Sequence, residues 1–255
     1  MLLQMVTGYS KAQLISHDQE ALNAQTLQEL NHLSEQRLNG LPMAYIIHHR
    51  EFFGRYFNVT PKVLIPRPET EHLIETVLEK LTVQDKPTIW DLGTGSGIIA
   101  ITLKLECPQS TVFASDLSEE ALAIARQNAQ QLNADIQFFQ GSWFEAFPHS
   151  QSAITFDFLV SNPPYIEAND PHLLQGDLRF EPAMALTDFG NGLSAFQTLV
   201  QQGKQYLKPQ GWLIMEHGFE QAEAIRALLT QYGYHHIETK KDLAGLDRIS
   251  LGQHL

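Results

Sequence analysis

The chain has 255 residues, of which 43% are hydrophobic, enough to fill the cores of one sizeable domain and one small one. Its formal net charge of -12 disfavours a broad cationic face for duplex phosphates, so protein or small-molecule partners are expected rather than stably bound nucleic acid. The single cysteine, Cys107, excludes an intrachain disulfide and a zinc–thiolate cluster, and the absence of a signal-peptide pattern and of an apolar run approaching ~20 residues argues against export and membrane insertion. A cytoplasmic protein is therefore expected.

Residues 1–50 predict a small helical unit. They are polar and rich in Gln, Asn and His, with leucines at positions 27, 30 and 33, and Gly40 follows the helical pattern. The opening segment, Met1 to Val6, has the pattern of an apolar helix whose beginning is absent, so we expect this unit to be truncated. Residues 51–65 contain an aromatic stretch broken by Gly54 and predict a short hairpin linker. A second domain is expected over residues 66–255.

That second domain begins with a proline-stiffened entry into a helix and then alternates between strands and helices. Strands are predicted over 89–92, 111–114, 136–139 and 156–160, and helices over 98–105 and 118–132, the latter capped by Ser118. This order indicates an α/β fold with a doubly wound, mostly parallel, Rossmann-like sheet. A long connection over 166–190 is a candidate substrate loop. It is followed by predicted elements at 193–207, 212–215, 219–232, 234–240 and 248–252.

A glycine-rich loop follows the first of these strands. Gly93, Gly95 and Gly97 occupy alternate positions at the start of a predicted helix, where glycines let backbone approach a ligand and the helix supplies oriented N–H groups. The spacing differs from the dinucleotide fingerprint, since Ile98 stands where the third glycine would be, so NAD is disfavoured. Asp116 ends the next strand, from which a carboxylate can bind both ribose hydroxyls. A nucleoside cofactor is predicted here.

The stretch Ser161-Asn162-Pro163-Pro164-Tyr165 leaves the strand at 156–160. The prolines donate no N–H and leave the Pro163 carbonyl free as an acceptor, beside the side-chain carbonyl of Asn162. Two acceptors with the Tyr165 ring as a stacking face would receive a planar group that carries an NH2. An ordinary Asn-Pro turn is the alternative interpretation.

These motifs together resemble the class I S-adenosylmethionine-dependent methyltransferases that modify amino or amide nitrogen. The resemblance implies that the glycine loop and the Asn-Pro-Pro-Tyr loop open into one crevice, where strand order reverses. Trp143 stands where such enzymes enclose the adenine, and simple packing in the core is the alternative for this residue.

Over nearly the whole chain the sequence is similar to the release factor glutamine methyltransferase family, through residues 65–71, 91–97, 162–166, 180–182, 191–193 and 241–248. The resemblance implies transfer of a methyl group from S-adenosyl-L-methionine, leaving S-adenosyl-L-homocysteine, to N5 of the glutamine in the Gly-Gly-Gln loop of peptide chain release factors. It implies docking by the N-terminal helices and a probable monomer. The implied cofactor-binding residues are Gly93, Thr94, Gly95, Ser96, Gly97, Asp116, Trp143 and Asn162. The implied substrate-binding residues are Asn162, Pro163, Pro164 and Tyr165, of which Asn162, Pro163 and Tyr165 are assigned to catalysis.

Two other functions are weighed against this one: an amino-methyltransferase acting on a base nitrogen of DNA or RNA, and a non-catalytic cofactor-binding partner protein. The acidic composition argues against the first, and the presence of both motifs argues against the second. The eleven histidines lack metal-binding spacing, so no metal is predicted. For Arg67 and Glu69, contact with the substrate and a salt bridge at the helix entry both stay open. For Glu181, anchoring of the long loop across the site and ordinary surface exposure both stay open.

Overall fold

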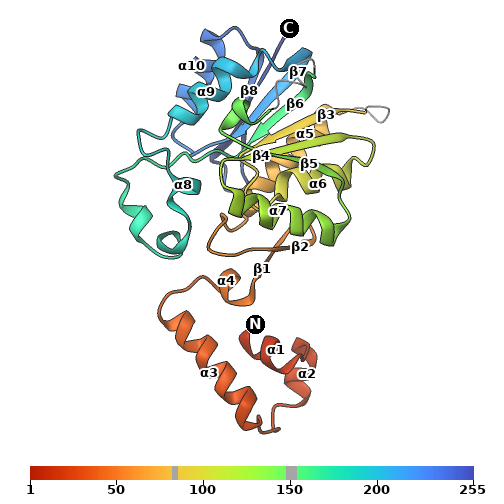
Figure 1. Ribbon diagram of the computed structural model, residues 1–255. Coiled ribbons are helices and arrows are strands. Elements are labelled where there is room, and N and C mark those ends of the chain that lie inside the picture. Colours follow the sequence, from red (N-terminus) through yellow and green to blue (C-terminus); the bar gives the residue numbers. More distant parts are fainter. Residues whose placement is uncertain (82–85, 148–153) are drawn as a thin grey trace.

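The computed structural model describes residues 1–81, 86–147 and 154–255, and its main body is built on a seven-stranded sheet (Figure 1). The spatial order of the strands is β5-β4-β3-β6-β7-β9-β8. All neighbours pair in parallel except β9, which is antiparallel to both β7 and β8. The bounds are Thr88–Leu92 for β3, Thr111–Asp116 for β4, Ile136–Gln140 for β5, Phe156–Ser161 for β6, Leu207–Glu216 for β7, His235–Lys241 for β8 and Asp247–Gln253 for β9. The predicted Rossmann-like, mostly parallel sheet is confirmed.

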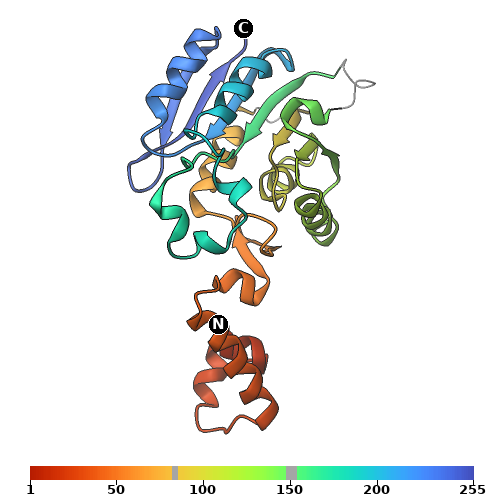
Figure 2. The same ribbon diagram turned by 60° about the vertical axis from the view of Figure 1, so that its left-hand side comes forward.

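Helices cover both faces of this sheet because its strands bury side chains on both sides (Figures 1 and 2). On β3, Ile89 packs with α5 (Glu71–Lys80) and α6 (Ile98–Glu106), to which α7 (Glu119–Leu132) adds Ala129. The next residue, Trp90, points to the opposite face and packs with α9 (Ser194–Gly203) and α10 (Ala222–Gln231). The alternation of strand side chains therefore produces two separate cores, one under each helical layer.

Two predicted helix boundaries move inward. Helix α9 ends at Gly203 rather than at 207, because Tyr206 N–H turns back to the Gly203 carbonyl at 3.0 Å before β7 begins. Helix α10 begins at Ala222 rather than at 219, because Gln221 Oε1 accepts the Gly218 N–H at 2.9 Å and forms a turn there. Both differences come from hydrogen-bonded turns that hydrophobic periodicity does not detect.

The N-terminal residues form the expected helical unit, which lies apart from the sheet (Figure 1). It contains α1 (Leu2–Thr7), α2 (Lys11–Ser16) and α3 (Ala24–Leu38), and no residue of these three helices is buried. A short helix, α4 (Met43–Ile47), leads to a hairpin made of β1 (His49–Phe52) and β2 (Arg55–Asn58). The hairpin thus starts two residues before the predicted linker. The buried Asn128 of α7 fixes its far end, exchanging hydrogen bonds with Asn58 at 2.8 and 3.1 Å.

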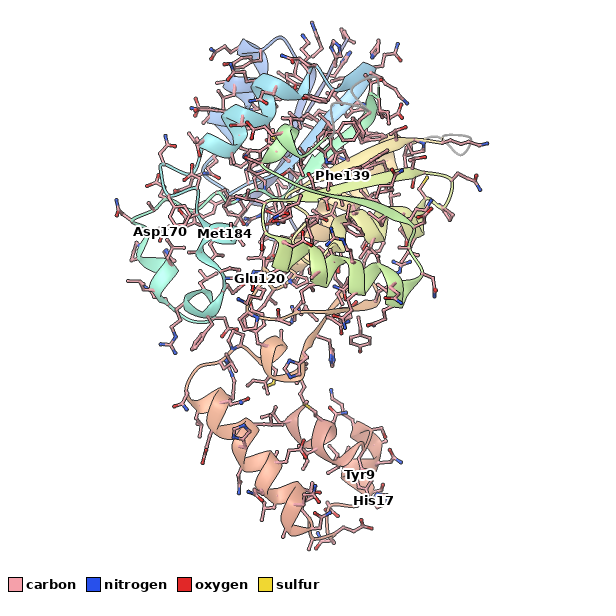
Figure 3. The ribbon with its side chains drawn as sticks, in the orientation of Figure 1. Tyr9, His17, Glu120, Phe139, Asp170 and Met184 are labelled. Atoms are coloured by element: carbon pink, nitrogen blue, oxygen red, sulfur yellow. The ribbon has the colours of Figure 1, made fainter. Side chains whose placement is uncertain are left out.

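The long connection after β6 contains three short helical turns: η4 (Pro171–Leu174), η5 (Leu178–Phe180) and α8 (Ala183–Leu186). Glu181 anchors it, since its buried side chain accepts the Ile65 N–H at 2.9 Å and pairs with Arg67 at 2.5 Å. An exposed pair, Arg37–Asp177 at 3.2 Å, joins the connection to α3. Figure 3 shows Met184 on the part of this connection nearest the sheet and Asp170 on its outer side. Of the alternatives left open for Glu181, loop anchoring is therefore the observed one.

Candidate functional site

A cavity of about 360 Å³ opens at the carboxyl edge of the sheet, next to the point where strand order reverses between β3 and β6. The glycine loop and the Asn-Pro-Pro-Tyr loop both line it. The lining includes eight of the eleven residues assigned to cofactor or substrate binding: Gly93, Thr94, Gly95, Ser96, Asp116, Trp143, Asn162 and Pro164. The other three, Gly97, Pro163 and Tyr165, do not line it, whereas Arg67, whose role was left open, does.

The glycine loop is held open by hydrogen bonds to the two strands beside it. The N–H groups of Gly93 and Thr94 both bond the Ser115 carbonyl at 2.9 Å, and the Thr94 hydroxyl donates to the buried Asp91 at 2.6 Å. Gly95 has φ +56°, and a Cβ at this position would meet nothing within 4 Å. The loop therefore presents bare backbone to the cavity, as close approach of a ligand requires.

Gly97 has a different reason to be glycine. Its φ is +85°, and a Cβ would lie 2.8 Å from Ile101 Cδ1 and 3.2 Å from Ala125 Cβ. The residue caps the amino end of α6 where that helix packs against α7. In this structure Gly97 supports helix packing rather than the cavity wall.

Asp116 stands at the end of β4, directly at the cavity. Its carboxylate accepts the Gly95 N–H and the Ser118 N–H, both at 2.9 Å. Burial raises the pKa of Asp116 above its ordinary value, although these backbone donors act in the opposite direction. The carboxylate thus fixes the glycine loop, and carboxylate lone pairs beyond these two bonds remain for a ligand hydroxyl.

Trp143 begins the short helix η2 (Trp143–Ala146) with φ +45°, an unusual value for a bulky residue. Its ring forms part of the cavity wall, and a Cβ on Gly93 would lie 3.6 Å from Trp143 Cζ3. The ring also packs against the core cluster of the α9–α10 face. Trp143 therefore packs on the core and also borders the cavity, and its place beside the adenine stays a prediction.

In the acceptor motif, Asn162 Nδ2 donates to Thr70 Oγ1 at 3.2 Å. Within the described residues, no hydrogen bond engages Asn162 Oδ1 or the Pro163 carbonyl, so both acceptors are available. Tyr165 lies behind this turn: its carbonyl accepts from Gln221 at 3.0 Å, and burial raises the pKa of its hydroxyl. The stacking role expected of the Tyr165 ring stays a prediction.

Two buried carboxyl groups lie at this edge of the sheet, and burial raises the pKa of each to about 7. For Asp91, on β3, hydrogen bonds from the Thr94 hydroxyl and the Ala100 N–H act against this rise of the pKa. Glu216 ends β7, and sequence reasoning passed over it together with Thr70. The available signal was weak: a charged residue directly after the apolar run 212–215, at the same edge as the acceptor motif.

The comparisons with known proteins agree with this arrangement. Residues 70–178 match the family described as the methyltransferase small domain, and residues 1–47 match the PrmC N-terminal domain. A release factor glutamine methyltransferase of Neisseria gonorrhoeae is 50% identical over 255 residues, covering 100% of this chain and 92% of that protein. One from Bordetella pertussis is 48% identical, covering 99% and 92%. The chain belongs to the release factor glutamine methyltransferase family.

Solved structures of other methyltransferases share the fold of this chain. A methyltransferase from Pyrococcus furiosus aligns with TM-score 0.59 and 18% identity, covering 88% of this chain and 98% of that chain. The 16S rRNA N2 G1207 methyltransferase of T. thermophilus, solved in complex with AdoMet and guanosine, aligns with TM-score 0.58 and 16% identity, covering 81% and 50%. At these identities the likeness concerns the fold.

No helix in the described ranges is both long and apolar enough to cross a membrane. Among residues 1–81, 86–147 and 154–255, no three His, Cys, Asp or Glu side chains gather in a way that could hold a metal ion.

Proposed function

We propose that this chain transfers a methyl group from S-adenosyl-L-methionine to the side-chain amide nitrogen of the glutamine in the Gly-Gly-Gln loop of peptide chain release factors. The observation that carries the proposal is that the glycine loop, Asp116 and Asn162 line one cavity, and that no hydrogen bond within the described residues engages Asn162 Oδ1. Full-length identity of 50% to a protein named for this activity supports it.

The residues present fit the cofactor. Gly95 leaves open space beside the loop, Asp116 supplies a carboxylate for ribose hydroxyls, and Trp143 offers an apolar wall for the base. When bound, the cofactor supplies an electrophilic methyl group on a sulfonium. The carboxylate of Asp116, which lines the cavity, favours a cationic ligand when it is ionised.

The acceptor side must position a poor nucleophile, since the lone pair of an amide nitrogen is delocalised into its carbonyl. Asn162 Oδ1 and the Pro163 carbonyl accept the two N–H groups, which orients the nitrogen and stabilises positive charge that develops on it. The proton leaves to solvent after transfer, so no side chain acts as a general base.

Partner and location follow from the substrate. We propose a monomer that acts on release factors in the cytoplasm, where translation factors are found, with the N-terminal helices helping to dock the factor. The exposed faces of α1, α2 and α3, which bury no side chain, are available for such docking. Methylation of a base nitrogen in DNA or RNA is the alternative, which the net charge of -12 disfavours.

The experiment is methylation of purified release factors, DNA and RNA with labelled cofactor, followed by mass spectrometry of the factor. We expect one added methyl on the Gly-Gly-Gln glutamine and none when that glutamine is replaced by Glu, because carboxylate oxygens would face two acceptors and the nucleophile would be lost. A Gln→Asn replacement shortens the reach by one methylene, about 1.5 Å, and should react very slowly. Labelled nucleic acid with an unmodified factor would refute the proposal.

A further inference from the structure

Glu216 is a buried acid that the proposed mechanism does not use. It is 1% exposed, and its Oε2 has no hydrogen-bond partner within the described residues. On the neighbouring parallel strands β6 and β7, Ser161 pairs with Met215. The next residues along these two strands, Asn162 and Glu216, therefore lie side by side at the edge that forms the site.

Thr70 connects the two side chains. It is fully buried, and its Oγ1 accepts from Asn162 Nδ2 at 3.2 Å. Thr70 and Asn162 both act to lower the pKa of Glu216, against the larger effect of burial, so both lie close to its carboxyl group. The NH2 end of the Asn162 amide points to Thr70, which leaves Oδ1 on the other side.

This orientation matters because an asparagine amide can turn over and exchange its oxygen for its NH2 group. An ionised carboxylate only accepts hydrogen bonds, so it attracts Nδ2 and repels Oδ1. A flipped Asn162 would present NH2 to the incoming glutamine NH2, and two donors would face each other. The same flipped Asn162 would suit a carboxylate.

We propose that Glu216 and Thr70 are positioning residues that lock the Asn162 amide with its oxygen toward the acceptor, and that this lock sets the preference for a carboxamide over a carboxylate. The inference rests on the proposed function and names the residues that give the site its selectivity.

The charges around Glu216 come from two elements. Arg248, on β9, and Glu69, in η1 (Pro68–Thr70), both face it. Arg248 is shared with Asp242, which it contacts at 3.1 and 3.3 Å, and its Nη1 donates to the His217 carbonyl at 3.4 Å. Glu216 thus has a cation nearby that is already paired elsewhere.

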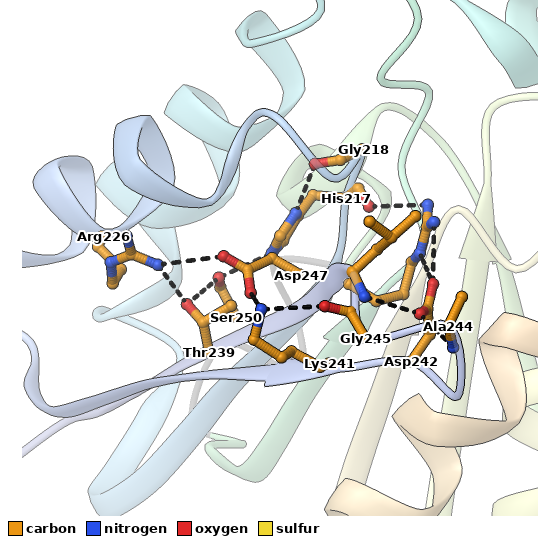
Figure 4. Close-up of polar contacts among 12 residues, drawn as sticks. His217, Gly218, Arg226, Thr239, Lys241, Asp242, Ala244, Gly245, Asp247 and Ser250 are labelled. Atoms are coloured by element: carbon orange, nitrogen blue, oxygen red, sulfur yellow. Dashed lines mark hydrogen bonds and ion pairs between the residues drawn. The ribbon is translucent and has the colours of Figure 1, made fainter.

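The residue after Glu216 is fixed by a polar network (Figure 4). His217 bonds the Gly218 carbonyl and Ser250 Oγ, both at 2.8 Å, and Ser250 Oγ lies 2.9 Å from Thr239 Oγ1. This network holds the end of β7 on β9 and β8, so the Glu216 backbone has a fixed position beside Asn162.

The test compares two release-factor peptides, one with the Gly-Gly-Gln loop and one with Glu in place of the glutamine, for binding to the intact protein. Glu216→Gln removes the lock, because the new carboxamide can donate to Asn162 Oδ1 in the flipped orientation as readily as it accepts from Asn162 Nδ2 in the original one. Two evenly populated orientations lower the turnover of the native factor only about twofold. The sharper readout is affinity for the Glu peptide, which should rise at least ~10-fold relative to the Gln peptide.

Variants of Glu69 and Thr70 distinguish an effect on the Asn162 amide from a general effect of charge. Glu69→Gln removes a neighbouring negative charge that does not contact the Asn162 amide, and the ratio of the two affinities should stay within about twofold of the unmodified protein. Thr70→Val removes the acceptor of Asn162 Nδ2 without changing charge, so affinity for the Glu peptide should rise relative to the Gln peptide. Thr70→Ser keeps the hydroxyl and should keep the relative affinity of the unmodified protein. The Thr70 variants also keep the inference falsifiable if Glu216→Gln does not fold.

A pH series adds a second readout. Burial raises the pKa of Glu216 to about 7, so acidification through that range gives Glu216 a proton that can bond Oδ1 of a flipped Asn162. Relative affinity for the Glu peptide should therefore rise as pH falls below about 7 in the unmodified protein and stay flat in Glu216→Gln. A Glu216→Gln ratio within twofold of the unmodified protein, or an equal change in Glu69→Gln, overturns the lock. Failure of the unmodified protein to methylate the native factor would instead overturn the proposed function.

Discussion

Replacing Arg67 with alanine tests how the long connection after β6 is held. Arg67 pairs with Glu181 at 2.5 Å, and the Glu181 side chain is completely buried while that of Arg67 is 31% exposed. After the replacement, the Ile65 N–H at 2.9 Å is the hydrogen bond to this carboxylate that remains among the residues that the structure describes. Removing one partner of a buried pair typically costs 3–5 kcal/mol, and the partial exposure of Arg67 places the expected loss of unfolding free energy near the low end, about 3 kcal/mol.

The loss should depend on pH. Burial already raises the pKa of Glu181 despite the Arg67 charge, and without that charge the pKa rises further. Protonation of Glu181 then removes the unpaired buried charge, so the deficit of Arg67→Ala should be largest near pH 8 and shrink as pH falls toward 5. Urea unfolding followed by circular dichroism at both pH values measures this.

The matched control is Arg37→Ala, because Arg37 contacts Asp177 in the same connection at 3.2 Å, with side chains 44% and 47% exposed. Such a pair contributes about 0–1 kcal/mol, without a marked pH dependence between 5 and 8. Equal losses in the two variants, or a deficit of Arg67→Ala that grows on acidification, would show that burial of Glu181 does not govern this anchor.

Three further outcomes are expected. Asp116→Ala should weaken cofactor binding by about 2–4 kcal/mol, since two ribose hydroxyls lose a charged acceptor; calorimetry measures it, and an affinity unchanged within about twofold would place the ribose elsewhere. Asn162→Ala should lower methyl transfer at least ~10²-fold in a labelled-cofactor assay while cofactor affinity changes much less; a loss of a few-fold in a folded protein would make Asn162 a turn residue only. Asp91→Asn should alter the pH dependence of stability. The pKa of Asp91 rises from 3.8 to about 7 in the folded chain, which therefore binds the proton more tightly than the unfolded chain, and the free energy of unfolding falls as pH rises from about 4 to 7. Between pH 5 and pH 8 the free energy of unfolding, measured with denaturant, should fall by about 2–4 kcal/mol less in Asp91→Asn than in the unmodified protein. An equal fall in the two proteins would show that the pKa of Asp91 is not raised.

Strand positions could be predicted because buried parallel strands are continuous apolar runs ended by polar residues. The run over 156–160 and the strand observed at Phe156–Ser161 differ by one residue, and Ser118 caps α7 as expected by accepting the Ala121 N–H. The placement of the glycine loop and Asn162 at one cavity was implied by the resemblance to the class I methyltransferases, in which these two loops lie where strand order reverses.

The relation of Thr70, Asn162 and Glu216 could not be predicted in the same way. Asn162 and Thr70 are 92 positions apart in sequence, and their contact depends on how the tertiary fold brings η1 to the residue after β6. The packing role of Gly97 could not be predicted either, because a glycine that is needed for packing against Ala125 cannot be distinguished in sequence from one that is needed for a ligand. Pairwise tertiary contacts of this kind leave no periodic signal.

The reversed direction of β9 has a consequence for the order in which the site is built during synthesis. Because β9 is antiparallel to β7, its beginning rather than its end reaches the carboxyl edge, and the Arg248 carbonyl accepts the His217 N–H there at 2.9 Å. β9 follows the other six strands of the sheet in chain order, and it also separates β7 from β8. A nascent chain that has already made the glycine loop and Asn162 still lacks Arg248, the cation whose charge acts on Glu216 and Tyr165. The surroundings of Glu216 and Tyr165 are therefore completed only when β9 has been translated and inserted.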